Sequence, residues 1–301
     1  MKVIKEITIE MTNECPLECL HCSTKNSPFY VKGIEKYKKE YEEEIKTADT
    51  LEKHIEVISK WNNIYRKNFD IKSDDLSSDQ LIQIAKDIVD KDKKSNYRIR
   101  FSGGEPMLIL EQRHFNVLNR CKNIKEFIIN TSGYEGIKKF TVEKATIRYR
   151  FSVYGNKIQH EHMTVVRTYN RLIRSIEEAI KMGYDVDFTC PVFEKSNVMN
   201  VIELAKKYNN RPIRLAKDIW YSFGTVGIKG DIYDSIVHND CKRQLTIAEE
   251  CKKIYPLIDI TCSLHGECHV MCDYPKLTVL ATGKIIGCAV EKQGCIDGST
   301  Y

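Results

Sequence analysis

The sequence predicts an α/β fold, an open, TIM-like partial (β/α)6 barrel followed by a small cysteine-rich C-terminal domain. Six β-strand patterns alternate with helical patterns up to about residue 217. Such alternation is typical of a parallel sheet with right-handed crossover connections. Six units are two fewer than a complete eightfold barrel contains, so we expect the barrel to be open. Beyond residue 218 the alternation stops, and most of the 12 cysteines of the chain lie in that part.

The six strands follow from short runs in which β-branched or aromatic residues alternate with polar ones. They are predicted over residues 3–11, 98–102, 126–131, 146–153, 185–192 and 212–217. Helices are predicted near residues 77–91, 111–122, 168–182 and 197–208, with a short helix after Gly133. Gly183 is a suitable C-cap for the third of these helices. The predicted domains are a barrel over residues 1–217 and a cysteine-rich domain over residues 218–301.

A polar, highly charged segment over residues 25–75 interrupts the barrel pattern after the first strand. Helical spacings occur around residues 34–47 and 51–68. We interpret this segment as an inserted helical lid with a mostly solvated surface.

Composition excludes several classes of function. Of the 301 residues, 42% are hydrophobic, and the formal net charge of +5 is spread along the chain, so no nucleic-acid partner is predicted. Residues 1–10 lack the apolar run of a secretion signal, and no stretch is long and apolar enough for a membrane span. We therefore expect a cytoplasmic protein without a membrane partner. In that compartment 12 cysteines indicate metal binding or redox chemistry rather than disulfides.

Three cysteines follow the first predicted strand at short spacings, namely Cys15, Cys19 and Cys22. Iron–sulfur clusters bind thiolates, and a cluster of four irons normally has four protein ligands. Three ligands would leave one iron open to a small molecule. Spacing alone also permits a structural zinc site, with His21 or another residue as fourth ligand.

A second motif, Phe-Ser-Gly-Gly-Glu-Pro over residues 101–106, ends the second predicted strand on the same edge of the sheet. Gly103 and Gly104 allow the backbone to approach a ligand closely, and the carboxylate of Glu105 can hold an ammonium group. Taken by itself, the motif would be a tight turn with Pro106 in the first turn of a helix.

Together the two motifs resemble the radical S-adenosylmethionine (radical SAM) superfamily over residues 3–217, with residues 25–75 as an enlarged insertion. The resemblance implies that Cys15, Cys19 and Cys22 hold a 4Fe–4S cluster whose open iron binds the methionyl part of S-adenosylmethionine. It implies that the 103–106 motif also binds this cofactor and that Gly103, Gly104 and Glu105 hold its amine.

Further cofactor contacts are expected from hydroxyl groups at the ends of the next two strands. Thr131 or Ser132 and then Ser152 are placed to bond the ribose, and residues 190–192 to frame the adenine. The alternative for each hydroxyl is a capping or turn role.

The C-terminal cysteines suggest a second cluster. A predicted hairpin with its turn at Thr282–Gly283 ends at Cys288 and resembles the auxiliary-cluster domains called SPASM and twitch. The resemblance implies an auxiliary 4Fe–4S cluster on Cys262, Cys268, Cys272 and Cys288. In the SPASM order the dense cysteine run follows the hairpin, whereas here it precedes the hairpin.

The remaining cysteines have other expected roles. Cys241, Cys251 and Cys295 are left for a second auxiliary cluster, and zinc with His265 or His269 is an alternative to iron. Cys121 and Cys190 are predicted to be core residues, with a hydrogen-donor role for the Cys190 thiol as an alternative.

The resemblance implies that S-adenosylmethionine is cleaved reductively to a 5′-deoxyadenosyl radical, which abstracts hydrogen from a substrate. An external flavodoxin- or ferredoxin-type protein would supply the electron. We expect the substrate to be a ribosomally made peptide that undergoes epimerisation or cross-linking in natural-product (RiPP) maturation. The lack of room for an N-terminal leader-binding module counts mildly against a peptide.

Two other functions remain open. One is an oxidoreductase, a radical dehydrogenase of a small sugar- or cyclitol-type metabolite. The other, more remote, is a non-catalytic, zinc-stabilised binding protein, which would have no use for Glu105. No catalytic acid or base is predicted. Three basic residues alternate with apolar residues at the sixth strand. They are expected at the rim of the barrel or in solvent, and they are Arg211, Arg214 and Lys217.

Overall fold

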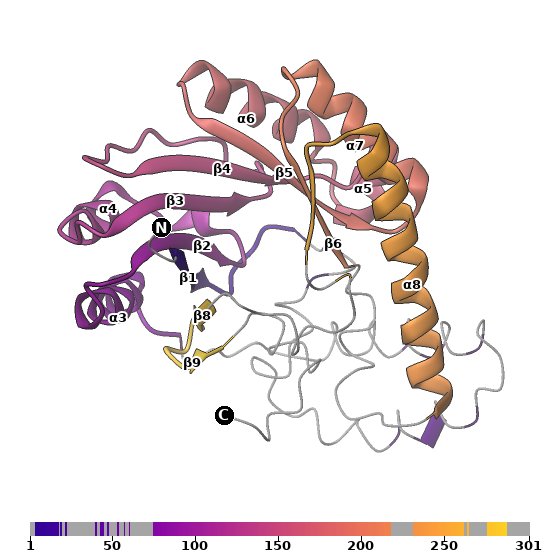
Figure 1. Ribbon diagram of the computed structural model, residues 1–301, viewed down its shortest axis with the longest axis horizontal. Coiled ribbons are helices and arrows are strands. Elements are labelled where there is room, and N and C mark those ends of the chain that lie inside the picture. Colours follow the sequence, from indigo (N-terminus) through magenta and orange to yellow (C-terminus); the bar gives the residue numbers. More distant parts are fainter. Residues whose placement is uncertain are drawn as a thin grey trace.

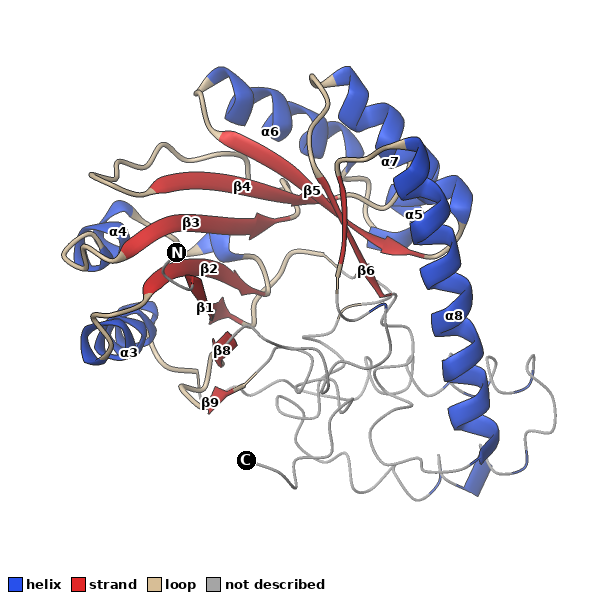
Figure 2. Ribbon diagram, in the orientation of Figure 1, coloured by secondary structure: helices blue, strands red, loops and turns tan. Residues whose placement is uncertain are grey.

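The computed structural model describes residues 4–17, 19, 22, 40, 43, 44, 47, 53, 57, 60, 75–217, 231–261, 264 and 276–287. Its centre is a nine-stranded sheet in the order β7-β6-β5-β4-β3-β2-β1-β8-β9. Neighbouring strands are parallel except β8 and β9, which form an antiparallel hairpin. The sheet curves, and helices cover its convex side (Figure 1). Figure 2 shows the strands lining the concave side. The predicted fold class, an α/β partial barrel, is confirmed.

The strands are β1 (Ile4–Thr12), β2 (Asn96–Gly103), β3 (Ile124–Thr131), β4 (Thr146–Ser152), β5 (Asp185–Val192), β6 (Ile213–Lys217), β7 (Ile258–Ile260), β8 (Lys276–Val279) and β9 (Ile285–Ile286). The helices are α3 (Ser78–Lys91), the short 3-10 helix η1 (Pro106–Leu108), α4 (Gln112–Leu118), α5 (Lys157–Thr164), α6 (Tyr169–Lys181), α7 (Lys195–Lys207) and α8 (Asp231–Ile254). The six predicted strands are β1 to β6.

The core lies between the convex side of the sheet and the helices. Successive strand residues point to opposite faces, so every second residue of a strand can enter this core. Phe101 of β2 and Phe127 of β3 are fully buried there, and their rings lie 5.3 Å and 5.1 Å from the ring of Phe115 on α4. The other set of strand residues faces the concave side and is largely polar.

The segment after Gly133 differs from the prediction, because residues 132–145 form a loop instead of a short helix. Gly133 and Gly136 have φ angles of 73° and 78°, which a right-handed helix does not accommodate. The loop is fixed instead by tertiary contacts. Lys138 Nζ donates to the Met107 and Leu110 carbonyl oxygens, at 2.6 and 3.1 Å.

The predicted division into domains at residue 217 stays a prediction. Part of the predicted second domain extends the barrel sheet, because β7 pairs with β6 and β8 pairs with β1. The predicted hairpin around Gly283 is present as β8 and β9. The four predicted auxiliary ligands, Cys262, Cys268, Cys272 and Cys288, lie outside the described residues, as do His265, His269 and Cys295.

Of the predicted insertion, only scattered residues between 40 and 60 and the end at Asp75 are described. Those between 40 and 60 are helical. Among the helices that the structure describes, none has both the length and the apolar character that crossing a bilayer requires.

Candidate functional site

The candidate site lies at the carboxyl ends of β1 to β4, which meet at one edge of the parallel sheet. The chain leaves β1 into a segment that we name the cysteine loop, residues 13–22. The 103–106 motif follows β2, and Thr131 and Ser132 stand at the end of β3. The predicted site residues therefore belong to one rim, as the pattern of alternating strands and helices required.

The three cysteines of the loop are half-buried, and none takes part in a disulfide. The Cys22 amide donates to the Cys19 carbonyl oxygen at 3.2 Å, so the last two cysteines close a tight turn. Among the residues described, no three His, Cys, Asp or Glu side chains form a group that could hold a metal ion. The thiols thus share one loop, and their assignment as cluster ligands stays a prediction.

Gly103 and Gly104 bring the 103–106 motif against the backbone of the cysteine loop. Gly103 has a φ of +113°, and a Cβ atom there would lie 2.4 Å from the Thr12 carbonyl oxygen. A Cβ atom on Gly104 would lie 2.0 Å from the Glu14 carbonyl oxygen. Sequence reasoning assigned the missing side chains to close approach of a ligand. The structure shows that they permit close approach of the loop that carries the cysteines.

Two backbone hydrogen bonds fasten this contact. The Gly104 amide donates to the Thr12 carbonyl oxygen at 2.6 Å, and the Glu105 amide donates to that of Glu14 at 2.8 Å. The end of β2 therefore fixes where the cysteine loop starts.

Glu105 is buried, and its carboxylate accepts four hydrogen bonds. Thr131 Oγ1 and the Met107 amide donate to Oε1 at 2.9 and 3.1 Å. Ser132 donates to Oε2 through its amide at 2.9 Å and its hydroxyl at 2.6 Å. Burial raises the pKa of the Glu105 carboxyl above its usual range, although these four donors oppose the shift. A nearby cation would favour the ionised form.

The hydroxyl protons of Thr131 and Ser132 are thus directed to Glu105. Their oxygens accept from the amides of Gly133 and Tyr134, at 3.0 and 3.3 Å. These two residues hold the carboxylate at the rim, a role that the sequence did not reveal because it depends on contact between neighbouring strands. Ribose binding by either residue stays a prediction.

Replacing Glu105 with Gln should test how far the carboxylate organises the rim. An amide nitrogen would face N–H or O–H donors on either side, so at least one buried bond would be lost, at a cost of about 1–3 kcal/mol. We expect this loss in the free energy of unfolding in urea, with weaker S-adenosylmethionine binding in equilibrium dialysis. The control is Glu135→Gln, in the exposed part of the next loop. Equal stability of the two variants would contradict this role of Glu105.

Tyr154, which sequence reasoning missed, lies between the rim and the helices. It is buried, and its pKa is raised well above the usual range by burial and by the charges of the cysteine loop, against a hydrogen bond with the Ser152 side chain. Its ring stacks on that of His160 in α5, with 5.1 Å between centroids. Ser152, predicted to bond ribose, therefore lies beside a tyrosine that interacts with the three cysteines. In the sequence, the Tyr154-Gly155 pair that follows β4 could have indicated that this tyrosine belongs to the site.

His160 should make stability depend on pH. Burial lowers its pKa from 6.5 to about 4, and its Nε2 atom is buried without a hydrogen-bond partner. Between these values the unfolded chain binds a proton that the folded chain does not, so stability falls as pH falls, by up to about 1.4 kcal/mol per pH unit.

The measurement is urea unfolding at about pH 7 and about pH 5.5 for the native protein and His160→Asn, whose side chain does not titrate there. The native protein should lose about 1 kcal/mol more between the two pH values than the variant. An equal loss of stability in the native protein and in His160→Asn would show that His160 does not titrate as inferred.

The described cysteines outside the loop do not join this site. Cys190 is fully buried, and its Sγ accepts a hydrogen bond at 3.2 Å from Asn197 Nδ2 on α7. It therefore points to the helix layer, which confirms its core role and leaves the hydrogen-donor alternative without support. Cys121 and Cys251 are also buried. Cys241 lies within α8, and its side chain is outside the described set.

The fold is an open partial barrel, and both motifs lie at the carboxyl edge of its sheet. Solved structures with this fold include SuiB of Streptococcus suis bound to its precursor peptide SuiA, with a TM-score of 0.56 and 13% identity. Native anSMEcpe with bound AdoMet and Cp18Cys peptide has a TM-score of 0.55 and 14% identity. SuiB bound to S-adenosylmethionine gives a TM-score of 0.50 and 11% identity.

These matches cover almost the whole of this chain. The SuiA complex covers 96% of this chain and 60% of SuiB, and the anSMEcpe complex covers 95% of this chain and 74% of that protein. The SuiB complex with S-adenosylmethionine covers 96% of this chain and 59% of SuiB. The chain thus spans about three fifths of the length of SuiB. No protein-family model and no curated protein sequence matched the chain. At this level of identity the likeness is one of fold, and it agrees with the predicted α/β partial barrel.

Proposed function

We propose that this protein is a radical SAM enzyme whose substrate is a ribosomally made peptide. The observation that carries the proposal is the contact between the Gly-Gly-Glu segment and the start of the cysteine loop, at the carboxyl edge of a partial barrel. This contact brings two motifs, separated by about 80 residues of sequence, into one site. A structural zinc loop would not require a buried carboxylate held by four donors beside it.

The donor set fits an iron–sulfur cluster with one open iron, because the thiolates of such a cluster bind different irons and need not converge on one point as the ligands of a single metal ion do. Cys15, Cys19 and Cys22 are three half-buried thiols in a single loop, and thiolates are the usual ligands of such clusters. When bound, the cluster would supply the electron that cleaves S-adenosylmethionine to a 5′-deoxyadenosyl radical.

Glu105 acts in this proposal mainly through its charge. A carboxylate offers about four lone-pair directions, and all four are occupied by protein donors. The methionyl ammonium group would therefore donate to backbone carbonyl oxygens of the 103–106 motif, while the negative charge of Glu105 stabilises it from beneath. Tyr154 and the stacked His160 close the site on the α5 side and exclude water.

The peptide substrate is favoured by the neighbours in fold, since both SuiB and anSMEcpe were crystallised with a peptide. We propose epimerisation or cross-linking as the outcome, with an auxiliary cluster on the C-terminal cysteines and a flavodoxin- or ferredoxin-type reductant. The second candidate remains a dehydrogenase of a small metabolite.

The test is 5′-deoxyadenosine formation by anaerobically reconstituted protein given S-adenosylmethionine and a strong reductant. Product above the no-enzyme control, even without substrate, would support radical initiation. Colourless protein that contains zinc and forms no product would overturn the proposal in favour of a metal-stabilised binding protein.

A further inference from the structure

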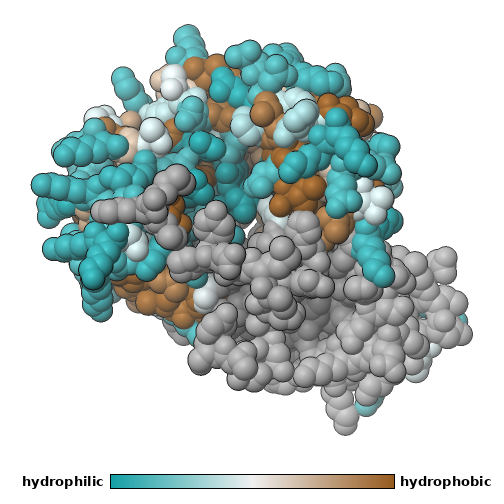
Figure 3. Space-filling view, in the orientation of Figure 1, coloured by the Kyte–Doolittle hydropathy of each residue, from teal (hydrophilic) through white to brown (hydrophobic). Residues whose placement is uncertain are grey.

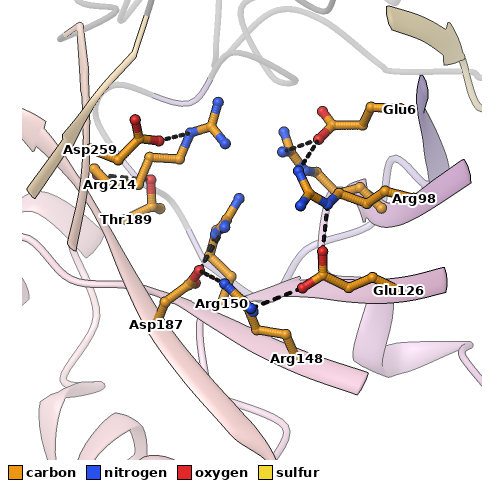
Figure 4. A network of polar contacts seen from close by, with 10 residues as sticks. Glu6, Arg98, Glu126, Arg148, Arg150, Asp187, Thr189, Arg214 and Asp259 are labelled. Atoms are coloured by element: carbon orange, nitrogen blue, oxygen red, sulfur yellow. Dashed lines mark hydrogen bonds and ion pairs between the residues drawn. The ribbon is translucent and has the colours of Figure 1, made fainter. Parts of the chain in front are cut away.

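The concave face of the barrel carries an unusual number of arginines. They lie at alternating positions of three strands, Arg98 and Arg100 on β2, Arg148 and Arg150 on β4, and Arg214 on β6. Figure 4 shows the side chains of Arg98, Arg148, Arg150 and Arg214 on the concave side of the sheet, together with acidic side chains from the neighbouring strands. The sequence pattern suggested that Arg214 lies at the rim or in solvent. The structure corrects this, because the side chain is only 21% exposed and belongs to the interior group.

Three acidic residues pair with four of these arginines. Arg100 and Arg98 lie 2.8 and 3.7 Å from Glu6. Glu126 lies 2.5 Å from Arg98 and 3.0 Å from Arg148. Asp187 lies 2.6 Å from Arg150 and 3.4 Å from Arg148. Each of the three acids is thus shared between two arginines.

The fifth arginine is weakly compensated. Arg214 Nε lies 3.9 Å from Asp259, whose side chain is 69% exposed to solvent. Glu10 adds one buried acid on β1, and Lys276 on β8 adds one more positive charge that acts on Glu6. Of the five arginines, Arg214 is therefore the one whose acidic partner is most exposed to solvent.

Several guanidinium N–H groups in this interior have no hydrogen-bond partner. They are Nη1 of Arg150, Nε of Arg100 and Nε of Arg148. Arg150 is more than nine-tenths buried, with 7% of its surface exposed. A buried donor on a charged group that lacks an acceptor costs free energy, which a bound acceptor would recover.

Electrostatics agree with this geometry. Burial, together with the charges of Arg150, Arg214 and Arg98, lowers the pKa of Arg100 to about 9 against the opposing effect of Glu6. The charge of Arg214 on β6 contributes to lowering the pKa of both Glu6 on β1 and Arg100 on β2. Other arginines thus oppose the charge of Arg100, whereas at Arg150 the effect of burial on the pKa is outweighed by Asp187, Glu6 and Glu126.

Four of the five arginines lie on β2 and β4, whose carboxyl ends belong to the candidate site. Arg150 precedes Ser152 by two residues on β4, so the two residues face the same side of the sheet. The space-filling view shows a hollow near the middle of the molecule, bordered on one side by hydrophilic residues (Figure 3). A substrate group that passes the rim would next meet these guanidinium groups.

We propose that the interior of the barrel binds a carboxylate group of the substrate, held by Arg100, Arg150 and Arg214. This inference rests on the proposed function and narrows its substrate class to one that carries a carboxylate near the reacting atom. Guanidinium groups suit it, because their planar forks match the two oxygens of a carboxylate. The source is either an acidic side chain of a peptide or a free small carboxylic acid.

Three variants remove the proposed contacts while leaving Glu6, Glu126 and Asp187 paired or neutral. Arg214→Gln removes the least compensated arginine. Arg100→Gln leaves Glu6 with Arg98. The double variant Arg150→Gln with Asp187→Asn removes a buried ion pair as a unit, which avoids an isolated charge. The matched control is Arg113→Gln on α4, whose exposed side chain pairs with Asp79 and Glu111 on the outer surface.

The probes are two capped tripeptides, Ala-Glu-Ala and Ala-Gln-Ala, together with glutarate, glutaramide and inorganic phosphate. Each is titrated calorimetrically into the reconstituted protein with S-adenosylmethionine at constant ionic strength. We expect the carboxylates to bind about 10-fold more tightly than the matching amides, and each interior variant to lose about that factor. Arg113→Gln should bind like the native protein.

The outcomes separate the sources. Tighter binding of the glutamate peptide than of glutarate supports a peptide carboxylate, and the reverse order supports a small acid. Phosphate binding more tightly than either, no preference for carboxylate over amide, or an equal loss in Arg113→Gln overturns the inference. The same preparations are assayed for 5′-deoxyadenosine without substrate. Product there together with no carboxylate preference means that this inference fails while the proposed function stands.

Discussion

Replacing Cys15, Cys19 and Cys22 together with alanine should reduce 5′-deoxyadenosine formation to the level of the no-enzyme control. The three thiols are the cluster ligands in the proposed mechanism, and without them no electron can enter S-adenosylmethionine. The start of the loop is held by a contact between backbone atoms, so the fold should tolerate the change. Chromatographic detection of 5′-deoxyadenosine after anaerobic reconstitution measures the effect.

The control for this experiment is Cys121→Ala, which removes a buried thiol at the helix layer, 3.7 Å from Asp90. It should retain activity. Iron analysis of the triple variant adds a second result, since iron should remain bound by the C-terminal cysteines. Loss of all iron would contradict the presence of two separate cluster sites.

Replacing Gly104 with Ala should damage both stability and the cysteine loop. The new Cβ atom would lie 2.0 Å from the Glu14 carbonyl oxygen, and a backbone oxygen has no rotamer by which to move away. The loop and β2 must separate, which strains the bond from the Gly104 amide to Thr12. Overpacking of this kind costs about 1–3 kcal/mol. We also expect iron incorporation at the N-terminal site to fall severalfold.

Gly136→Ala is the matched control, since no atom lies within 4 Å of a Cβ there. Its φ of +78° adds backbone strain of about 1 kcal/mol, which Gly104→Ala does not carry because the φ of Gly104 is not positive, so any excess loss in Gly104→Ala is due to the clash. Urea unfolding and iron content are measured for both. If Gly104→Ala and Gly136→Ala have the same stability and the same iron content, then Gly103 and Gly104 do not position the cysteine loop.

The strands that build the site could be predicted from the sequence because their two faces differ. In the run RIRFS, apolar residues enter the core and arginines face the concave side, so period-two alternation survives in a parallel sheet. The two motifs could be assigned to one rim for the same reason, since they follow consecutive strands.

Other features depended on contacts between distant parts of the chain. The hydrogen bonds from Ser132 to Glu105 join the ends of two strands, and no local sequence pattern predicts them. The interior arginines were visible as residues, but their pairing depends on sheet register and curvature. Helix α8 was missed because its sequence, rich in charged residues, lies within a region that we interpreted as irregular from its glycines and cysteines.

The pairing of β8 with β1 has a consequence for how the protein is made. Glu6 is the register partner of Lys276, so these strands are separated by 270 residues of chain, the difference between 276 and 6. Until residues 276–279 leave the ribosome, β1 has β2 on one side and lacks its β8 partner on the other. Unpaired strand edges are templates for association with other chains. Chains released before residue 276 should therefore aggregate, and completion of this side of the sheet must wait for the synthesis of β8.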